Sequence, residues 1–299
     1  MELEHPVELL VHSYLEDVRQ GESTMSEENV QGIVKHVEEA VRKQFKKREG
    51  GFRLRASNIG RVPCQLWFQK NKPEAAIPPP AHFLLRMMIG DITEAVFKGV
   101  LKEAGATFEK PEKIETEIAG EKVSGEYDLV LDNKVDDIKS TSPWSYKNKW
   151  LDGDSIEKSD PFGYVGQLTV YAKGKNVEPG GWWVVNHSTG EFKYVKYTSD
   201  PAKVERDLEK TVTTIKNNEF RRCFTPVKET FYRKETGRYV ELSTQLRDVR
   251  LVLKNKRMSG VRAAIEARRE ADSDLTEELR KIGYTTTGSV AAKLGFTRF

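Results

Sequence analysis

Two aspartates and a lysine lie close together near the middle of the chain, in a pattern that suits metal-assisted hydrolysis. Asp128 follows Gly125 in the segment GEYD, and Asp137 and Lys139 flank Ile138 in the segment DIK. Carboxylate oxygens are the ligands that Mg²⁺ prefers, and a bound divalent metal activates water and stabilises charge on a phosphate. A neighbouring lysine can orient or deprotonate that water, or stabilise the transition state. These residue types predict phosphodiester hydrolysis.

The segments around these residues alternate as β-strands do. The expected strands are 112–118, 122–132 and 134–139, joined by turns at 119–120 and 132–133. Residues two apart in a strand share a face, so Asp137 and Lys139 project together while Ile138 points into the core. Asp128 is expected near the middle of its strand, where hairpin pairing brings it beside Asp137. Without this context, an Asp-x-Lys pair is more often a strand-edge salt bridge.

Helical periodicity surrounds the strands and predicts an α/β fold. The expected helices begin at Ser26 and at about 82, 161 and 200, and two further strands are expected at 181–187 and 191–197. This order predicts a central mixed sheet flanked by helices. We expect a helical N-terminal region at 1–50, a core at 51–225, and a charged, mostly helical extension at 226–299 with a hairpin near 230–243.

Three polar residues on the helices flanking the strands extend the pattern. Gln167 and Tyr171 are spaced to share one face of the helix after the lysine strand. Glu94, on the helix before the strands, is positioned to add a carboxylate to a metal site. The alternative roles are a core aromatic with its hydroxyl at the rim for Tyr171, and an exposed helix acid for Glu94.

Taken in order, G-x-x-D, D-x-K and Q-x-x-x-Y resemble the RecB-type branch of the PD-(D/E)XK nuclease superfamily. The resemblance covers about residues 55–225 and extends to the S-x-x-x-x-x-x-C pattern from Ser57 to Cys64. The branch includes nuclease domains of bacterial recombination helicase–nucleases, CRISPR-adaptation nucleases, mitochondrial genome-maintenance exonucleases and phage exonucleases. The resemblance implies a restriction-endonuclease-like core.

The same resemblance implies roles for individual residues. Asp128 and Asp137 would bind Mg²⁺ or Mn²⁺ together with the backbone carbonyl of Ile138, and Lys139 would be the catalytic lysine. The resemblance further implies that Gln167 and Tyr171 contact DNA or brace the site, and that Glu94 adds a metal ligand.

The chain departs from its apparent relatives at two points. Many relatives have histidine where Glu94 falls, so the metal ligands differ. Iron–sulfur members use four cysteines, whereas this chain has only Cys64 and Cys223. Two thiolates cannot supply the four ligands of a cubane cluster, so we expect no iron–sulfur cluster.

The stretch that follows the lysine strand is typical of single-strand binding. Trp144, Tyr146 and Trp150 interleave with Lys147 and Lys149. Aromatic faces stack on unpaired bases while lysines contact phosphates. The alternative is a loop anchored by two buried tryptophans. Further candidates for DNA contact are Arg55, Ser57, Arg61, Arg221 and Arg222.

Composition bounds these hypotheses without deciding between them. The chain has 49 Lys and Arg against 46 Asp and Glu, and this balance alone does not indicate nucleic-acid binding. The two cysteines form no C-x-x-C pair, which argues against a zinc ribbon. The start lacks the pattern of a signal peptide, and no apolar run approaches the ~20 residues of a membrane span. We therefore expect a cytoplasmic protein, in a bacterium or a phage-infected cell, with no membrane partner.

The leading functional hypothesis is a DNA exonuclease that acts on single strands or duplex ends in replication, recombination or repair. Three alternatives are a structure-specific or restriction-like endonuclease, an inactive nucleic-acid-binding protein on a nuclease fold, and a phosphoesterase for small nucleotides. Residues 226–299 are candidates for binding a second copy of the chain or a replication or recombination partner.

Overall fold

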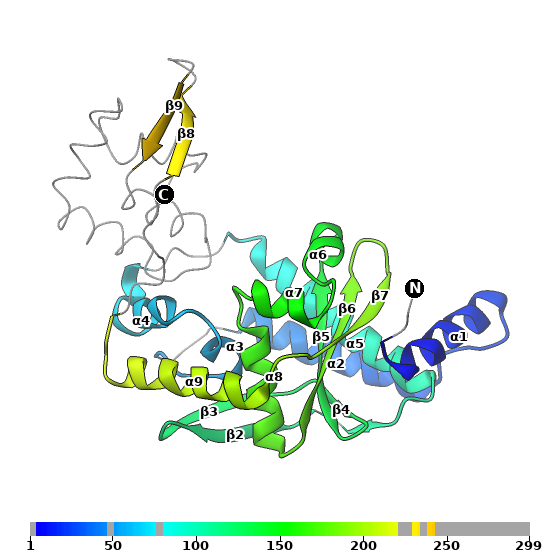
Figure 1. The fold of residues 1–299 in the computed structure, drawn as a ribbon. Coiled ribbons are helices and arrows are strands. Elements are labelled where there is room, and N and C mark those ends of the chain that lie inside the picture. Colours follow the sequence, from blue (N-terminus) through cyan, green and yellow to red (C-terminus); the bar gives the residue numbers. More distant parts are fainter. Residues whose placement is uncertain are drawn as a thin grey trace. The chain divides into compact units, whose positions relative to one another are not determined.

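The computed structural model describes residues 4–46, 51–75, 80–109 and 111–220, together with the backbone of 229–233 and 238–242. Its centre is a five-stranded sheet in the order β1-β4-β5-β6-β7 (Figure 1). Strands β5 and β6 run parallel and the other neighbours antiparallel. The predicted mixed sheet flanked by helices is thereby confirmed. Its strands are β1 (Phe108–Glu109), β4 (Leu129–Leu131), β5 (Lys134–Thr141), β6 (Glu178–Asn186) and β7 (Phe192–Lys196).

The chain forms two compact units. The first comprises Met1–Arg61 and Pro80–Thr213, and the second comprises Val62–Pro79 and Thr214–Phe299. The N-terminal helices α1 (Pro6–Gln20) and α2 (Glu27–Phe45) belong to the same unit as the sheet. The second unit contains α4 (Pro63–Asn71), η1 (Pro73–Ala75) and the hairpin of β8 (Glu229–Arg233) with β9 (Arg238–Leu242), which was expected near 230–243.

One face of the sheet is covered by α8 (Tyr164–Lys175), by α9 (Pro201–Lys216) and by the short helix α3 (Ala56–Ile59). Helix α3 approaches α8 closely because glycines line the contact. A Cβ at Gly163 would lie 2.6 Å from the Cα of Gly60, and a Cβ at Gly166 would lie 2.9 Å from the same atom. Gly163 also has a φ of +77°, which favours glycine. The site-bearing helix α8 is therefore fixed by backbone packing.

The opposite face is covered by α5 (Phe83–Glu103) and α1. Phe97 of α5 packs against Trp183 of the sheet, with ring centroids 5.7 Å apart. Helix α1 attaches to the edge strand β7 through buried Glu8, whose carboxylate accepts a hydrogen bond from the backbone N–H of Tyr194 at 3.2 Å. Among the described helices, none combines the length and apolar character that crossing a bilayer requires.

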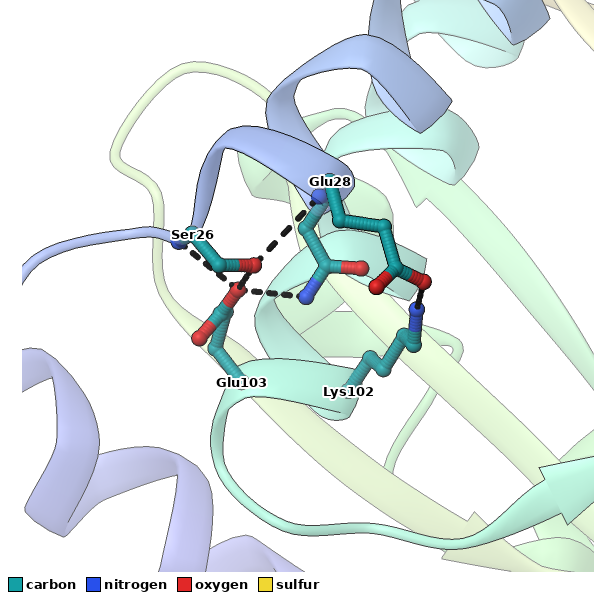
Figure 2. A network of polar contacts seen from close by, with 5 residues as sticks. Ser26, Glu28, Lys102 and Glu103 are labelled. Carbon is teal, nitrogen blue, oxygen red and sulfur yellow. Dashed lines mark hydrogen bonds and ion pairs between the residues drawn. The ribbon is translucent and has the colours of Figure 1, made fainter.

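A polar cluster joins the end of α5 to the start of α2 (Figure 2). Glu103 accepts hydrogen bonds from the backbone N–H of Ser26, at 2.9 Å, and from the side chains of Ser26 and Asn29. Lys102 forms an ion pair with Glu28 at 2.8 Å. Ser26 is the N-cap of α2, as predicted. This cluster fixes α2 against α5, the helix that carries Glu94.

The strand expected at 122–132 is wrong, because two strands in different sheets replace it. β3 (Glu121–Glu126) pairs with β2 (Lys113–Ile118) in a separate two-stranded sheet, whereas β4 joins the central sheet. Tyr127 is fully buried at the break, and Asp128 bonds to β5. Asp128 therefore lies just before a strand and not near its middle.

The turn between β4 and β5 follows the prediction. Asp132 and Asn133 have φ values of 50° and 58°, and Leu131 pairs with Lys134, which defines a two-residue hairpin. Two short helices, α6 (Pro143–Asn148) and α7 (Gly153–Lys158), follow β5.

Candidate active site

The two aspartates and the lysine singled out in the sequence meet at one place. Leu129 pairs with Asp136 in the β4–β5 register, so the preceding Asp128 lies beside Asp137. One carboxylate oxygen of Asp128 accepts a hydrogen bond from the backbone N–H of Ile138 at 2.7 Å. The Lys139 ammonium contacts the Asp137 carboxylate. Strand alternation and a tight hairpin together produce this convergence.

The electrostatics of the cluster disfavour two free carboxylates. Burial, reinforced by the charge of Glu94, raises the pKa of Asp128 to about 6. Burial raises the pKa of Asp137 to about 7, although Lys139 opposes this shift. Burial also opposes the charge of Lys139, but Asp137 and Asp128 outweigh it and raise the lysine pKa. The cluster therefore has more negative than positive charge to accommodate when both acids are ionised.

The buried Oδ2 of Asp137 forms an ion pair with the Lys139 ammonium. Asp128 lies beside this pair, and when both carboxylates are ionised a cation between them would offset the second negative charge. The donor set of Asp128, Asp137 and the Ile138 carbonyl therefore fits a hard divalent metal such as Mg²⁺ or Mn²⁺.

Glu94 does not join Asp128 and Asp137 as a third metal ligand, because other residues hold its carboxylate. Its carboxylate forms an ion pair with Lys98 at 2.6 Å and lies 3.7 Å from the His36 ring nitrogen. Across the described residues, no three His, Cys, Asp or Glu side chains are close enough to hold a metal ion. Glu94 acts on Asp128 through its charge, as the raised pKa of Asp128 records.

Lys98 and His36 were not anticipated from the sequence. Lys98 is buried, and its charge opposes the raised pKa values of Asp128 and Asp137. Its position four residues after Glu94 on one helix was a usable signal for the ion pair. His36 has no such signal, because only the packing of α2 against α5 brings it near Glu94.

Gln167 and Tyr171 lie together on α8, as their spacing predicts. The Gln167 amide donates to the Tyr171 hydroxyl at 2.8 Å. Burial and the charges of Asp137 and Asp128 raise the pKa of Tyr171, which records its proximity to the acids. Gly125 makes room for this ring, since a Cβ there would lie 2.6 Å from a Tyr171 ring carbon. Packing against the tyrosine thus explains why position 125 is a glycine.

The aromatic stretch after β5 divides into exposed and buried parts. Trp144 is 63% exposed, whereas Trp150 is 3% exposed and packs against Tyr164 and Trp182. The expectation that Trp150 stacks on a base is therefore wrong, because its ring belongs to the core. Lys193 lies 4.5 Å from the centroid of the half-buried Tyr146 ring, and burial raises the pKa of that tyrosine to about 12.

The other residues proposed for DNA contact lie at several places. Arg55 and Ser57 are exposed at the start of α3, Lys147 is exposed on α6, and Lys149 and Arg61 are partly buried. Cys64 is buried on α4 in the second unit. Arg221, Arg222 and Cys223 lie outside the described residues.

Comparisons with known proteins find a weak structural similarity and no match in sequence. No protein-family model matches the chain, and no curated protein matches it. A solved structure titled "Crystal structure of SSO0001" is similar at 18% sequence identity and a TM-score of 0.36, covering 64% of this chain and 88% of that chain. A likeness at this level carries no argument about function.

Proposed function

We propose that the chain is a divalent-metal-dependent DNA nuclease with a restriction-endonuclease-like core, of the kind found in the RecB-type branch of the PD-(D/E)XK superfamily. One observation carries the proposal. Asp128, Asp137 and Lys139 converge beside the β4–β5 hairpin, where the Lys139 ammonium contacts a buried oxygen of Asp137. A site of two carboxylates and an ammonium suits phosphodiester hydrolysis.

Asp128, Asp137 and the carbonyl of Ile138 would hold the metal. When bound, Mg²⁺ or Mn²⁺ supplies an acidified water and positive charge for the phosphate. Ionised Asp128 and Asp137 repel one another, and this repulsion favours a cation between them. Glu94 would join them only if its carboxylate left Lys98 and His36.

Lys139 is suited to stabilising negative charge. Its pKa is raised by the neighbouring aspartates, so its amine stays protonated at neutral pH. A protonated amine cannot take a proton from water, but it can orient that water and stabilise the charge that develops on the phosphate. Tyr171, bonded to Gln167, braces the wall of the site next to Asp137.

Exposed groups beside the site favour an end or a single strand as substrate. Trp144 presents most of its ring to solvent and lies near Lys149, whose ammonium is 6.0 Å from the ring centroid. An aromatic face next to a lysine suits an unpaired base and its phosphate. We therefore propose exonuclease action in replication, recombination or repair.

The test uses end-labelled linear single- and double-stranded DNA and covalently closed circular DNA, each with Mg²⁺, Mn²⁺ or EDTA. Lys139→Ala should abolish hydrolysis. Lys134→Ala is the matched control, because Lys134 is an exposed lysine on the same strand. Metal-dependent loss of linear DNA, with circles spared, is the expected result.

Two other outcomes would change the assignment. Cleaved circles would make the protein an endonuclease using the same site. Binding of DNA without hydrolysis in any metal would overturn the enzyme proposal and leave a nucleic-acid-binding protein.

A further inference from the structure

A pocket lies next to Lys139, between the end of β5 and the segment that runs from α6 to the start of α8. Its cavity volume is about 50 Å³, within a larger space of about 390 Å³ that includes open solvent. Its wall combines rings, a cation and hydroxyls. The residues that matter here are Ser145, Lys149, Ser159, Phe162 and Tyr164, with Lys139 at the edge shared with the site.

The rings form a stacking wall backed by the core. Phe162 and Tyr164 have centroids 5.4 Å apart with 36° between their planes, and Tyr164 in turn lies 5.3 Å from buried Trp150. Asp160 fixes the turn that carries both rings, since its carboxylate accepts hydrogen bonds at 2.8 Å from the backbone N–H groups of Gly163 and Val165. A wall fixed in this way loses little conformational entropy when a planar ligand stacks on it.

Positive charge is placed over these rings. The Lys149 ammonium lies 6.0 Å from the Phe162 centroid, and the Lys139 ammonium lies 5.1 Å from the Tyr164 centroid. Lys149 makes no ion pair with any residue that the structure describes. A ligand that satisfies this pocket combines a flat ring with an anionic group, and this combination describes a nucleotide.

We propose that this pocket binds one unpaired nucleotide of a DNA strand, next to the phosphate that is hydrolysed. The base stacks on Phe162 and Tyr164, and its phosphate lies near Lys149 and Ser145. The link to hydrolysis through Lys139 rests on the proposed function. Because a base in a duplex is stacked and paired, it enters only from a single strand or a frayed end. The pocket therefore gives the protein a preference for unpaired DNA.

The experiment measures binding, so that it does not depend on hydrolysis. Anisotropy of a labelled oligodeoxythymidine is titrated in EDTA with the wild type, Lys149→Gln and Phe162→Leu. Both variants should bind on the order of tenfold more weakly, as expected for loss of one stacked base or its phosphate contact. Lys134→Gln, at an exposed lysine at the other end of β5 and outside the pocket, is the matched control and should bind as the wild type does. Phe162→Tyr should retain binding, because it keeps a ring.

The same variants are titrated with a blunt duplex, for which a small change is expected. Wild-type affinity in both pocket variants would refute the proposal that the pocket binds a nucleotide. The absence of oligonucleotide binding by the wild type would also refute it. If the pocket variants bind more weakly but the wild type hydrolyses nothing, the nuclease proposal fails and the pocket stands. If hydrolysis depends on Lys139 while both variants bind normally, only the pocket fails. Circular dichroism of each variant identifies loss of fold, and Lys149→Gln decides the question if Phe162→Leu unfolds.

Discussion

Asp136 and Asp137 are adjacent on strand β5, are both buried, and both have a pKa raised to about 7 by burial. They face opposite sides of the sheet. Asp136 accepts hydrogen bonds from the Tyr194 hydroxyl at 3.0 Å and from the Trp183 indole at 3.1 Å. Asp137 instead has a charged partner, the Lys139 ammonium, at its buried Oδ2, and a second carboxylate, Asp128, beside it. Equal burial and equal pKa shifts therefore accompany different roles.

The difference shows what distinguishes a structural carboxyl from a candidate metal ligand. The residues around Asp136 supply hydrogen bonds to its carboxyl group. Gly180 leaves room for that group, because a Cβ at Gly180 would lie 2.1 Å from a carboxyl oxygen. Asp137 lies beside a second carboxylate, Asp128, and the single charge of Lys139 does not balance the two when both are ionised. A raised pKa alone does not indicate function; two carboxylates that face one ammonium make Asp137 the candidate metal ligand.

The largest effect that would test this contrast is on hydrolysis. Asp137→Asn should lower kcat/KM on labelled single-stranded DNA on the order of 10³-fold, because a metal ligand and its charge are lost. Asp136→Asn, at a temperature where it remains folded, should stay within about tenfold of the wild type. Equal losses in both variants would contradict the division of roles.

A pH dependence of stability follows from both residues. The ordinary pKa of 3.8 rises to about 7 in each, so between these values the folded state holds protons that the unfolded state releases. The free energy of unfolding should therefore fall as the pH rises from about 4 to about 7, by roughly 1 kcal/mol per pH unit for each proton. Urea denaturation across this range measures the slope, and Asp137→Asn should reduce it. A slope of opposite sign would refute the assignment.

Removing the Asp136 carboxyl should destabilise the fold. In Asp136→Ala the Trp183 indole N–H loses its acceptor, leaving a buried donor unsatisfied at a cost of about 1–3 kcal/mol. Urea denaturation at fixed pH measures this cost. Tyr194→Phe is the partner variant, and its effect should be smaller in the Asp136→Ala background than in the wild type. Fully additive effects would show that the two residues do not interact.

The smallest effect concerns metal. Mg²⁺ at tenfold above its Kd should raise the free energy of unfolding of the wild type by about 1.4 kcal/mol at pH 8, where the carboxylates are ionised. The gain should vanish in Asp137→Asn and persist in Asp136→Asn. Thermal denaturation with Mg²⁺ and with EDTA makes the comparison, and equal stabilisation of all three proteins would place the metal elsewhere.

Local periodicity is sufficient to determine several features of this molecule. Strand alternation predicted that Asp137 and Lys139 share a face while Ile138 enters the core, and the structure agrees. The N-cap at Ser26 and the β4–β5 turn were also predicted correctly, because both depend on neighbours only a few residues away. The expected strand at 122–132 failed because its pattern does not record the change from one sheet to another at Tyr127.

Tertiary packing decided the rest. Trp150 and Trp144 have similar sequence surroundings, yet only the first packs into the core, against Tyr164 and Trp182. His36 approaches Glu94 only because α2 lies along α5. The sequence by itself determined that β4 and β5 form a tight hairpin and that Asp128, Asp137 and Lys139 meet beside it. Burial, and with it the contrast between Asp136 and Asp137, depends on what distant segments place against each face, and no local pattern carries that information.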